Sequence, residues 1–229
     1  MLEIIRIHNE LLGTYGDRGN ADVLKYRAGL RKVKSRIIDI SYLDPIPKSA
    51  DIYLLGGAED AAQLLSLTAL KKGSILSKAA NKGAVVLAIC AGFQLIGEQY
   101  STRDESFSGL GLLNVTTTPG DKRLVGDIAV QTELFAAPLT GFENHSSVTT
   151  LGEGATPFGR VLAGNGNGVS QLDGAMNHNV FGTYMHGPVL ARNPEFADLL
   201  LERALNTSLS PVVDELAEQY ADWRRTLIK

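Results

Sequence analysis

Short apolar runs alternate with longer amphipathic stretches through the first hundred residues. The apolar runs have strand length, are rich in β-branched residues, and cover residues 2–8, 36–42, 51–55 and 83–90. Between them, apolar residues recur at helical spacing up to Val33 and again over residues 61–81, where Gly73-Ser74 predicts an interruption. Strands that alternate with helices in this way predict an α/β fold with an open, mostly parallel, doubly wound sheet and right-handed crossovers.

The pattern changes after Tyr100. From residue 122 to residue 183 the segments of strand character are short and punctuated by glycine, which predicts antiparallel additions in the second half of the chain. Two helices are expected near residues 193–205 and 212–227. Because no break in composition separates these parts, we expect one domain over residues 1–229, with a C-terminal helical extension over about residues 206–229.

Composition and charge exclude several classes of function for this chain. The 229 residues are 44% hydrophobic and 21% charged, as in ordinary globular proteins. A formal net charge of -3 argues against nucleic acid as a partner. The single cysteine excludes an internal disulfide, which fits a reducing compartment. The N-terminus lacks the layout of a signal peptide, and no apolar run is long enough for a transmembrane segment, so we expect a cytoplasmic protein.

Cys90 lies where a buried strand ends and a packed helix begins. Ala88 stands two positions before it and Gly92 two positions after it. Small residues at these positions are typical of a nucleophile elbow, a tight strand-to-helix turn that exposes one reactive side chain. The helix N-terminus would favour a thiolate there. The alternative is a core cysteine that acts as a small hydrophobic residue.

A cysteine nucleophile needs a base, and the chain has four histidines. His186 follows a strand that ends in small and aromatic residues, on the sheet edge where Cys90 should emerge, so it is the candidate base. His145 fits either a loop position or a ligand contact. A structural role is expected for His8, and an exposed turn for His178.

Two glycine-containing loops are candidates for ligand contact. Residues 11–20 contain three glycines but match no phosphate-binding motif, so we expect a loop that faces a ligand or a partner. Asp17 or Asn20 is a candidate cap for the following helix. Gly56-Gly57 ends a strand at the carboxyl edge of the predicted sheet, which is the usual ligand side of such folds. A plain tight turn is the alternative for this pair.

Together, these motifs resemble the class I (triad-type) glutamine amidotransferases, in particular their cobyric-acid-synthase-like branch. Three blocks carry the resemblance, at residues 54–57 (LLGG), 88–97 (AICAGFQLIG) and 182–188 (GTYMHGP). Within the branch, the chain is similar to the glutaminase subunits of lipid II isoglutaminyl synthases. Four further blocks support this, at residues 15–20 (YGDRGN), 123–127 (RLVGD), 142–146 (FENHS) and 186–194 (HGPVLARNP).

The resemblance implies a reaction and roles for particular residues. Cys90 would attack the side-chain amide of L-glutamine, and His186 would be the base. N–H groups near Gly57 and Ala91 would form the oxyanion hole. Arg123 would bind the substrate through the substrate's carboxylate. No metal site and no cofactor are expected on this chain.

The resemblance also implies a partner. The ammonia would pass to a Mur-ligase-like subunit of the MurT type, which would bind ATP and Mg and form a heterodimer with this chain. In that subfamily the acceptor is D-glutamate of the peptidoglycan stem on lipid II, which becomes D-isoglutamine. The alternatives are a corrinoid-type amidotransferase subunit, a non-catalytic binding or stress protein on the elbow fold, and a stand-alone hydrolase of γ-glutamyl bonds.

The sequence departs from the family pattern at two positions. Ala88 replaces the usual elbow glycine, and Pro188 stands where most members have the glutamate of a His-x-Glu motif. The third catalytic residue is therefore missing from its usual place, and we expect a Cys90–His186 dyad. The candidates for a group that orients the imidazole are Asp17, Asn144 and Asn193.

Overall fold

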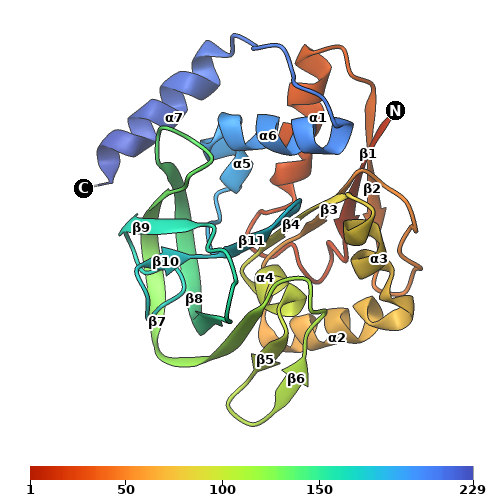
Figure 1. Cartoon of the computed structure of the whole chain (residues 1–229), viewed down its shortest axis with the longest axis vertical. Coiled ribbons are helices and arrows are strands. Elements are labelled where there is room, and N and C mark those ends of the chain that lie inside the picture. The colour runs from red at the N-terminus through yellow and green to blue at the C-terminus, as the bar shows by residue number, and fades with distance from the viewer. Residues whose placement is uncertain (229) are drawn as a thin grey trace.

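Six strands form the central sheet of the computed structural model, which describes residues 1–228 (Figure 1). Their order across the sheet is β11-β12-β4-β3-β1-β2, and every neighbouring pair is parallel except β11 with β12. The strands are β1 (Leu2–Ile7), β2 (Ser35–Ile40), β3 (Ile52–Leu55), β4 (Val85–Ile89), β11 (Ala175–Asn177) and β12 (Val180–Thr183). The mostly parallel sheet predicted from the alternating pattern is confirmed.

Helices cover this sheet in two groups, which Figure 1 shows above and below it. The upper group consists of α1 (Gly19–Leu30), α5 (Val189–Arg192), α6 (Pro194–Leu205) and α7 (Glu215–Leu227). The lower group consists of α2 (Asp60–Leu70), the 3-10 turn η1 (Lys72–Ser74), α3 (Ile75–Asn81) and α4 (Ala91–Ile96). The predicted interruption between α2 and α3 is confirmed, with Gly73 at φ 78°. No helix among residues 1–228 is long and apolar enough to cross a bilayer.

Helices on both faces explain why the central strands are apolar throughout. All residues of β3, β4 and β12 are buried. A strand with both faces covered has no solvent side, so its sequence reads as a continuous apolar run instead of an alternating one. These three strands lie next to one another, and their carboxyl ends therefore meet at one edge of the sheet.

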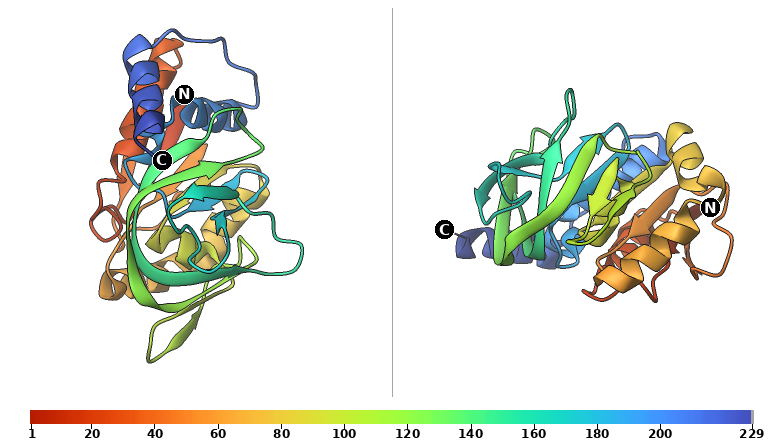
Figure 2. Two further views of the ribbon diagram at one scale, coloured as in Figure 1. Left: turned by 90° about the vertical axis from the view of Figure 1, so that its left-hand side faces the viewer. Right: turned by 90° about the horizontal axis from the view of Figure 1, so that it is seen from below.

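A second, mixed sheet is built from the middle of the chain. Its strands are β5 (Gln99–Ser101), β6 (Ser106–Ser108), β7 (Val115–Gln131), β8 (Leu139–Leu151), β9 (Gly159–Ala163) and β10 (Leu172–Asp173). The expected antiparallel additions are present, but the expectation of short segments was wrong for β7 and β8. They form one long curved ribbon (Figure 2). A register shift between Pro119 and Leu124 lets β7 bend and continue.

The start of α1 differs from the prediction. Arg18 occupies the N-cap position and makes no side-chain cap bond. The Asn20 carboxamide instead accepts a 3.0 Å hydrogen bond from the backbone N–H of Leu190, and Asp17 points toward His186. Both candidate caps are therefore used for tertiary contacts, and capping was the wrong interpretation of their position.

Candidate active site

Cys90 occupies a strained turn between β4 and α4. Its backbone has φ 52° and ψ -107°, a conformation that residues other than glycine rarely adopt. The turn brings the α4 backbone against β3, and the Gly92 N–H donates a 3.1 Å hydrogen bond to the Gly56 carbonyl. A Cβ on Gly92 would lie 2.7 Å from the Cβ of Leu55, so this position has no room for a side chain. The predicted nucleophile elbow is present.

His186 lies just beyond β12, the strand next to β4. The two strands are in register with Thr183 opposite Ile89, and the Cys90 N–H donates a 2.9 Å hydrogen bond to the Thr183 carbonyl. A two-way backbone bridge to Phe142 of β8 holds His186, with distances of 2.8 and 3.0 Å. The parallel pairing therefore brings the thiol and the imidazole to the same edge, although 96 positions separate them in the sequence.

Asp17 is the residue that contacts the imidazole. His186 Nδ1 donates to its carboxylate at 2.9 Å (Oδ2) and 3.1 Å (Oδ1), and both side chains are buried. Oδ2 also accepts a 2.9 Å hydrogen bond from the Gly57 N–H. Burial lowers the pKa of His186, but the Asp17 carboxylate and the Cys90 thiol outweigh it and raise that pKa well above its ordinary value. The imidazolium form is thus favoured.

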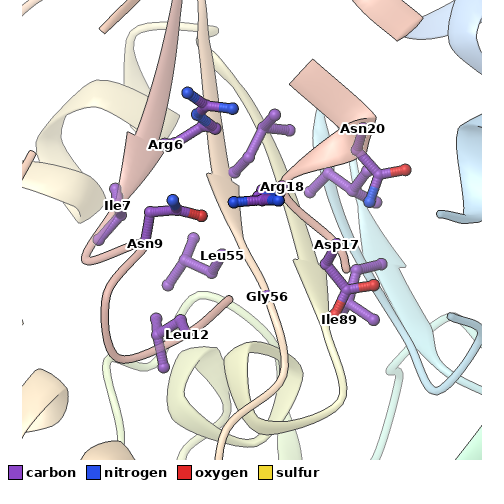
Figure 3. A pocket seen from close by; sticks show the side chains of 12 residues that line it. Arg6, Ile7, Asn9, Leu12, Asp17, Arg18, Asn20, Leu55, Gly56 and Ile89 are labelled. Atoms are coloured by element: carbon purple, nitrogen blue, oxygen red, sulfur yellow. The ribbon is translucent and has the colours of Figure 1, made fainter. Parts of the chain in front are cut away.

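A small cavity lies behind the segment that carries Asp17. Its volume is about 10 Å³, close to the smallest volume that holds one water molecule. Figure 3 shows Asp17, Arg18 and Asn20 around the beginning of α1, beside the end of β3 at Gly56. The hydrogen bonds to the Gly57 N–H and to His186, and not this cavity, hold the Asp17 carboxylate in place.

The other two candidates for the orienting group bond elsewhere. The Asn144 side-chain oxygen accepts a 2.8 Å hydrogen bond from Arg123 Nε. The Asn193 side chain accepts from the Thr140 N–H and donates to the carbonyls of Thr140 and Val189. Neither contacts His186 in this structure, so the structure assigns the contact to Asp17 alone among the three.

A cavity of about 70 Å³ opens in front of Cys90. Elements from both sheets line it: Tyr15, Ala58, Glu59, Asp60, Gln63, Cys90, Ala91, Gln94, Arg123, Asn144, His145, Ser146 and Ser147. The guanidinium of Arg123 is exposed at this cavity, and cationic Arg123 and anionic Glu59 both belong to its wall. The cavity therefore offers both charges to a zwitterionic ligand.

The N–H groups expected to form the oxyanion hole differ in their availability. The Gly57 N–H is bonded to Asp17, so it is not directed at the cavity. Ala91 is the first residue of α4, and its N–H has no intrahelical acceptor. The neighbouring Ala58 lines the same cavity, and its N–H has no hydrogen-bond acceptor among residues 1–228.

The relationship to known proteins agrees with this geometry. Residues 3–194 match the family of CobB/CobQ-like glutamine amidotransferase domains. This chain belongs to that family. The GatD subunit of lipid II isoglutaminyl synthase (glutamine-hydrolyzing) from Streptococcus pneumoniae is 36% identical to this amidotransferase over 96% of the chain and 91% of its own length.

Two further comparisons, one with a relative in sequence and one with a solved structure, extend beyond GatD. The cobyric acid synthase of Azorhizobium caulinodans is 32% identical over 80% of this chain, but the match covers only 37% of that enzyme. PurLQS from Thermotoga maritima superposes with a TM-score of 0.61 over 90% of this chain and 98% of its own, at 15% identity. The latter likeness concerns the fold alone.

Tyr15 is a residue of the amidotransferase site that sequence reasoning missed. Its ring lies 5.0 Å from that of His186, and its hydroxyl donates a 2.5 Å hydrogen bond to Glu59. A Cβ on Gly57 would come within 2.8 Å of both rings, so the glycine makes room for this contact. The signal was an aromatic residue within a glycine-rich loop whose ligand contact was already expected.

His145, left open between two interpretations, lies in the wall of the site. It is buried and stacks on Tyr184 with a centroid distance of 3.7 Å. Burial lowers its pKa to about 4, so the ring is neutral at neutral pH. His8 is fully buried and bonds to Ser66 at 2.8 Å, as expected of a structural histidine.

Proposed function

We propose that this chain is the glutaminase subunit of a two-subunit amidotransferase. The observation that carries the proposal is a cysteine on a strained elbow whose neighbouring histidine is hydrogen-bonded to a buried aspartate, beside a cavity with an exposed arginine. Nucleophile, base and orienting carboxylate in this order are the parts that acyl transfer from an amide requires.

Because the imidazolium form of His186 is favoured, the Cys90 thiol proton would already lie on His186 Nε2 when the thiolate Sγ attacks the side-chain amide carbon of glutamine in the first half of the reaction. Nδ1 is occupied by Asp17, and Nε2 has no hydrogen-bond partner among residues 1–228, so it is the nitrogen available for this step. His186 then gives the proton to the leaving nitrogen, the C–N bond breaks, and ammonia and a γ-glutamyl thioester result.

In the second half, water attacks the thioester carbon while His186 takes its proton. The C–S bond breaks, glutamate leaves, and the thiolate and the imidazolium are restored. The negative oxygen of both tetrahedral intermediates would lie against the N–H groups of Ala91 and Ala58, because the Gly57 N–H is already donated to Asp17.

Asp17 takes the place of the absent His-x-Glu carboxylate in this proposal. It holds the Nδ1–H tautomer, so that Nε2 faces the nucleophile, and it stabilises the imidazolium that forms. The chain would thus use a triad of Cys90, His186 and Asp17 instead of the dyad inferred from Pro188.

Arg123 is the proposed anchor for the α-carboxylate of glutamine. A guanidinium binds a carboxylate through two parallel hydrogen bonds, and Arg123 lines the cavity that Cys90 faces. Its Nε is held by Asn144 at 2.8 Å, which leaves the terminal nitrogens free for a ligand.

The acceptor of the ammonia is proposed to be D-glutamate of the lipid II stem, activated with ATP and Mg by a Mur-ligase-like subunit of the MurT type. This rests on a relative named as the GatD subunit of lipid II isoglutaminyl synthase, 91% of which aligns with this chain. The corrinoid alternative is less favoured, because the GatD relative is 36% identical over 96% of this chain, whereas the cobyric acid synthase is 32% identical over 80% of it.

The glutamine analogue 6-diazo-5-oxo-norleucine tests the site. Incubated with the chain and its MurT-type subunit, it should add its mass to Cys90, and glutamine should compete. Cys90→Ser should remain unlabelled. The two-subunit sample should also convert lipid II to its D-isoglutamine form with glutamine and ATP. An unlabelled Cys90 in the complex would overturn the proposal in favour of a non-catalytic protein.

A further inference from the structure

Helix α7 turns an apolar stripe toward the solvent. Leu216, Tyr220, Trp223 and Leu227 recur at spacings of four and three residues, with Val213 just ahead of the helix. These five residues, here called the α7 stripe, are between 39% and 80% exposed. The spacing puts them on one side of the helix, and it is the spacing of apolar residues that pack against another protein surface.

The side of α7 that faces the body of the protein is held by charged groups instead. Arg225 pairs with Glu195 and donates a 3.0 Å hydrogen bond to the Pro138 carbonyl, and Arg224 pairs with Asp127. Within the helix, only Ala221 is buried. A helix that only completed a core would turn its apolar residues toward the protein and its charged residues toward the solvent. The α7 stripe is therefore available to pack against another molecule.

The stripe continues along the surface to the mouth of the active site. The Arg224 guanidinium lies 5.7 Å from the Trp223 ring and pairs with Asp127 of β7. Asp127, Val125 and Arg123 alternate along the exposed face of β7, and Val125 is 56% exposed. The far end of this row reaches the cavity, because Arg123 is part of its wall.

Resting on the proposed function, we propose that the α7 stripe and Val125 form the docking surface for the subunit that consumes the ammonia. Glu215, Glu218 and Asp222, the exposed carboxylates of α7, lie on other sides of the helix, so that subunit presents a mainly apolar surface to the stripe. A subunit seated here would reach the opening from which ammonia leaves.

The size of the surface supports a partner that extends beyond α7. Thirteen helical residues are about 20 Å long, and a strip about 10 Å wide then measures only about 200 Å². Stable interfaces bury about 800 Å² on each partner. The occupant must therefore continue over β7, toward the cavity.

Two other occupants fit less well. A membrane-surface helix places basic residues on its polar side, whereas the exposed charges on the polar side of α7 are carboxylates. A second copy paired through α7 alone would bury only about 200 Å² on each partner, far less than a stable interface needs.

The test compares Leu216→Asp and Trp223→Ala with Leu43→Asp as a matched control, because Leu43 is 78% exposed and Leu216 is 80% exposed. Sedimentation measures binding to the MurT-type subunit, and the rate of Cys90 labelling by the glutamine analogue is measured on the chain without its partner. We expect both α7 variants to bind at least tenfold more weakly, while Leu43→Asp binds normally. All three should label like the unmodified chain.

Each other outcome is informative. Normal binding by both α7 variants would overturn the docking surface and leave the glutaminase intact. A homodimer of the unmodified chain that Leu216→Asp dissociates would assign the stripe to a second copy. Sedimentation with phosphatidylglycerol vesicles that the same change abolishes would assign it to a membrane. Labelling of Cys90 without any binding of the unmodified chain to the subunit would overturn both the docking surface and the proposed two-subunit enzyme.

Discussion

The pKa values of two buried histidines of the site are shifted in opposite directions by their surroundings. The pKa of His186 is raised by the Asp17 carboxylate and the Cys90 thiol despite burial. The pKa of His145 is lowered, because burial outweighs its hydrogen bonds to the backbone at Ser147 and Gly166 and the charge of His186 lowers the pKa further. The first histidine is thus prepared to exchange protons with a thiol, and the second stays a neutral part of the wall.

The contact between Asp17 and His186 predicts the effect of one substitution. Asp17→Asn removes the charge and no longer enforces the Nδ1–H tautomer, so kcat for glutamine hydrolysis in the complex should fall by about 10²-fold to 10⁴-fold. An NMR titration of the His186 ring should move to lower pH, because the carboxylate raises its pKa. Asp104→Asn, in an exposed loop, is the control. An unchanged kcat would contradict the triad.

His145 predicts a difference in acid stability. Its pKa is about 4 in the folded protein and about 6.5 in an unfolded chain, so the unfolded state binds the proton more readily. The stability from a neutral His145 is complete above pH 6.5 and is lost as pH falls toward 4. Between these limits, the free energy of unfolding should fall by up to about 3 kcal/mol more in the unmodified chain than in His145→Gln. Urea titrations measure this, with His178→Gln as the exposed control.

At the scale of elements, the site depends on how closely α4 approaches β3. The elbow puts Cys90 at φ 52°, and Gly92, two residues later, packs closely against Leu55 of the neighbouring strand. The β7–β8 ribbon contributes the other half of the site, because its bend brings Arg123 and Asn144 to the cavity. The site is thus formed where the two sheets meet.

Gly92→Ala tests the close approach of α4 to β3. Its methyl group would lie 2.7 Å from the Leu55 Cβ and 2.9 Å from its carbonyl oxygen, so we expect a loss of about 1–3 kcal/mol in the free energy of unfolding. Gly29→Ala, in α1, meets nothing within 4 Å and should be neutral or stabilising, because alanine favours helix. Equal melting temperatures for the two variants would exclude this explanation.

At the scale of the whole molecule, one arginine joins three parts of the upper helical layer. Arg27 of α1 donates to Asp198 of α6 at 2.6 and 2.7 Å and lies 3.4 Å from Asp214, the N-cap of α7. Arg31 adds a second pair of bonds to Asp198. Together the two arginines lower the pKa of Asp198 against the effect of burial. The C-terminal helix is thus tied to the beginning of the chain.

Arg27→Leu should therefore destabilise the protein strongly. The change leaves the partly buried Asp214 without Arg27 and leaves Asp198 with Arg31 alone, a loss that should cost about 1–3 kcal/mol. Arg36→Leu removes a pair with Glu3 in which the arginine side chain is 54% exposed, and it should cost less than about 1 kcal/mol. Chemical denaturation measures both. A cost for Arg27→Leu no larger than that for Arg36→Leu would show that the buried cluster adds nothing to stability.

Much of the fold and part of the site could be predicted from local patterns. Apolar runs, small residues around Cys90 and the order of strands predicted the parallel sheet, the elbow and the edge shared with His186. Asp17 was only one of three candidates, because its contact with His186 joins positions 169 residues apart. The Gly57 N–H was expected at the oxyanion, and nothing local indicated that a carboxylate would bind it.

The sequence by itself determined most of the strands and helices and the tight turn at Cys90, because hydrophobic periodicity and residue size act over a few neighbouring positions. Tertiary structure alone decided which carboxylate orients the imidazole, which N–H groups remain free, and which side of α7 faces the solvent. Those outcomes depend on side chains from distant segments that compete for the same hydrogen bonds and the same buried space.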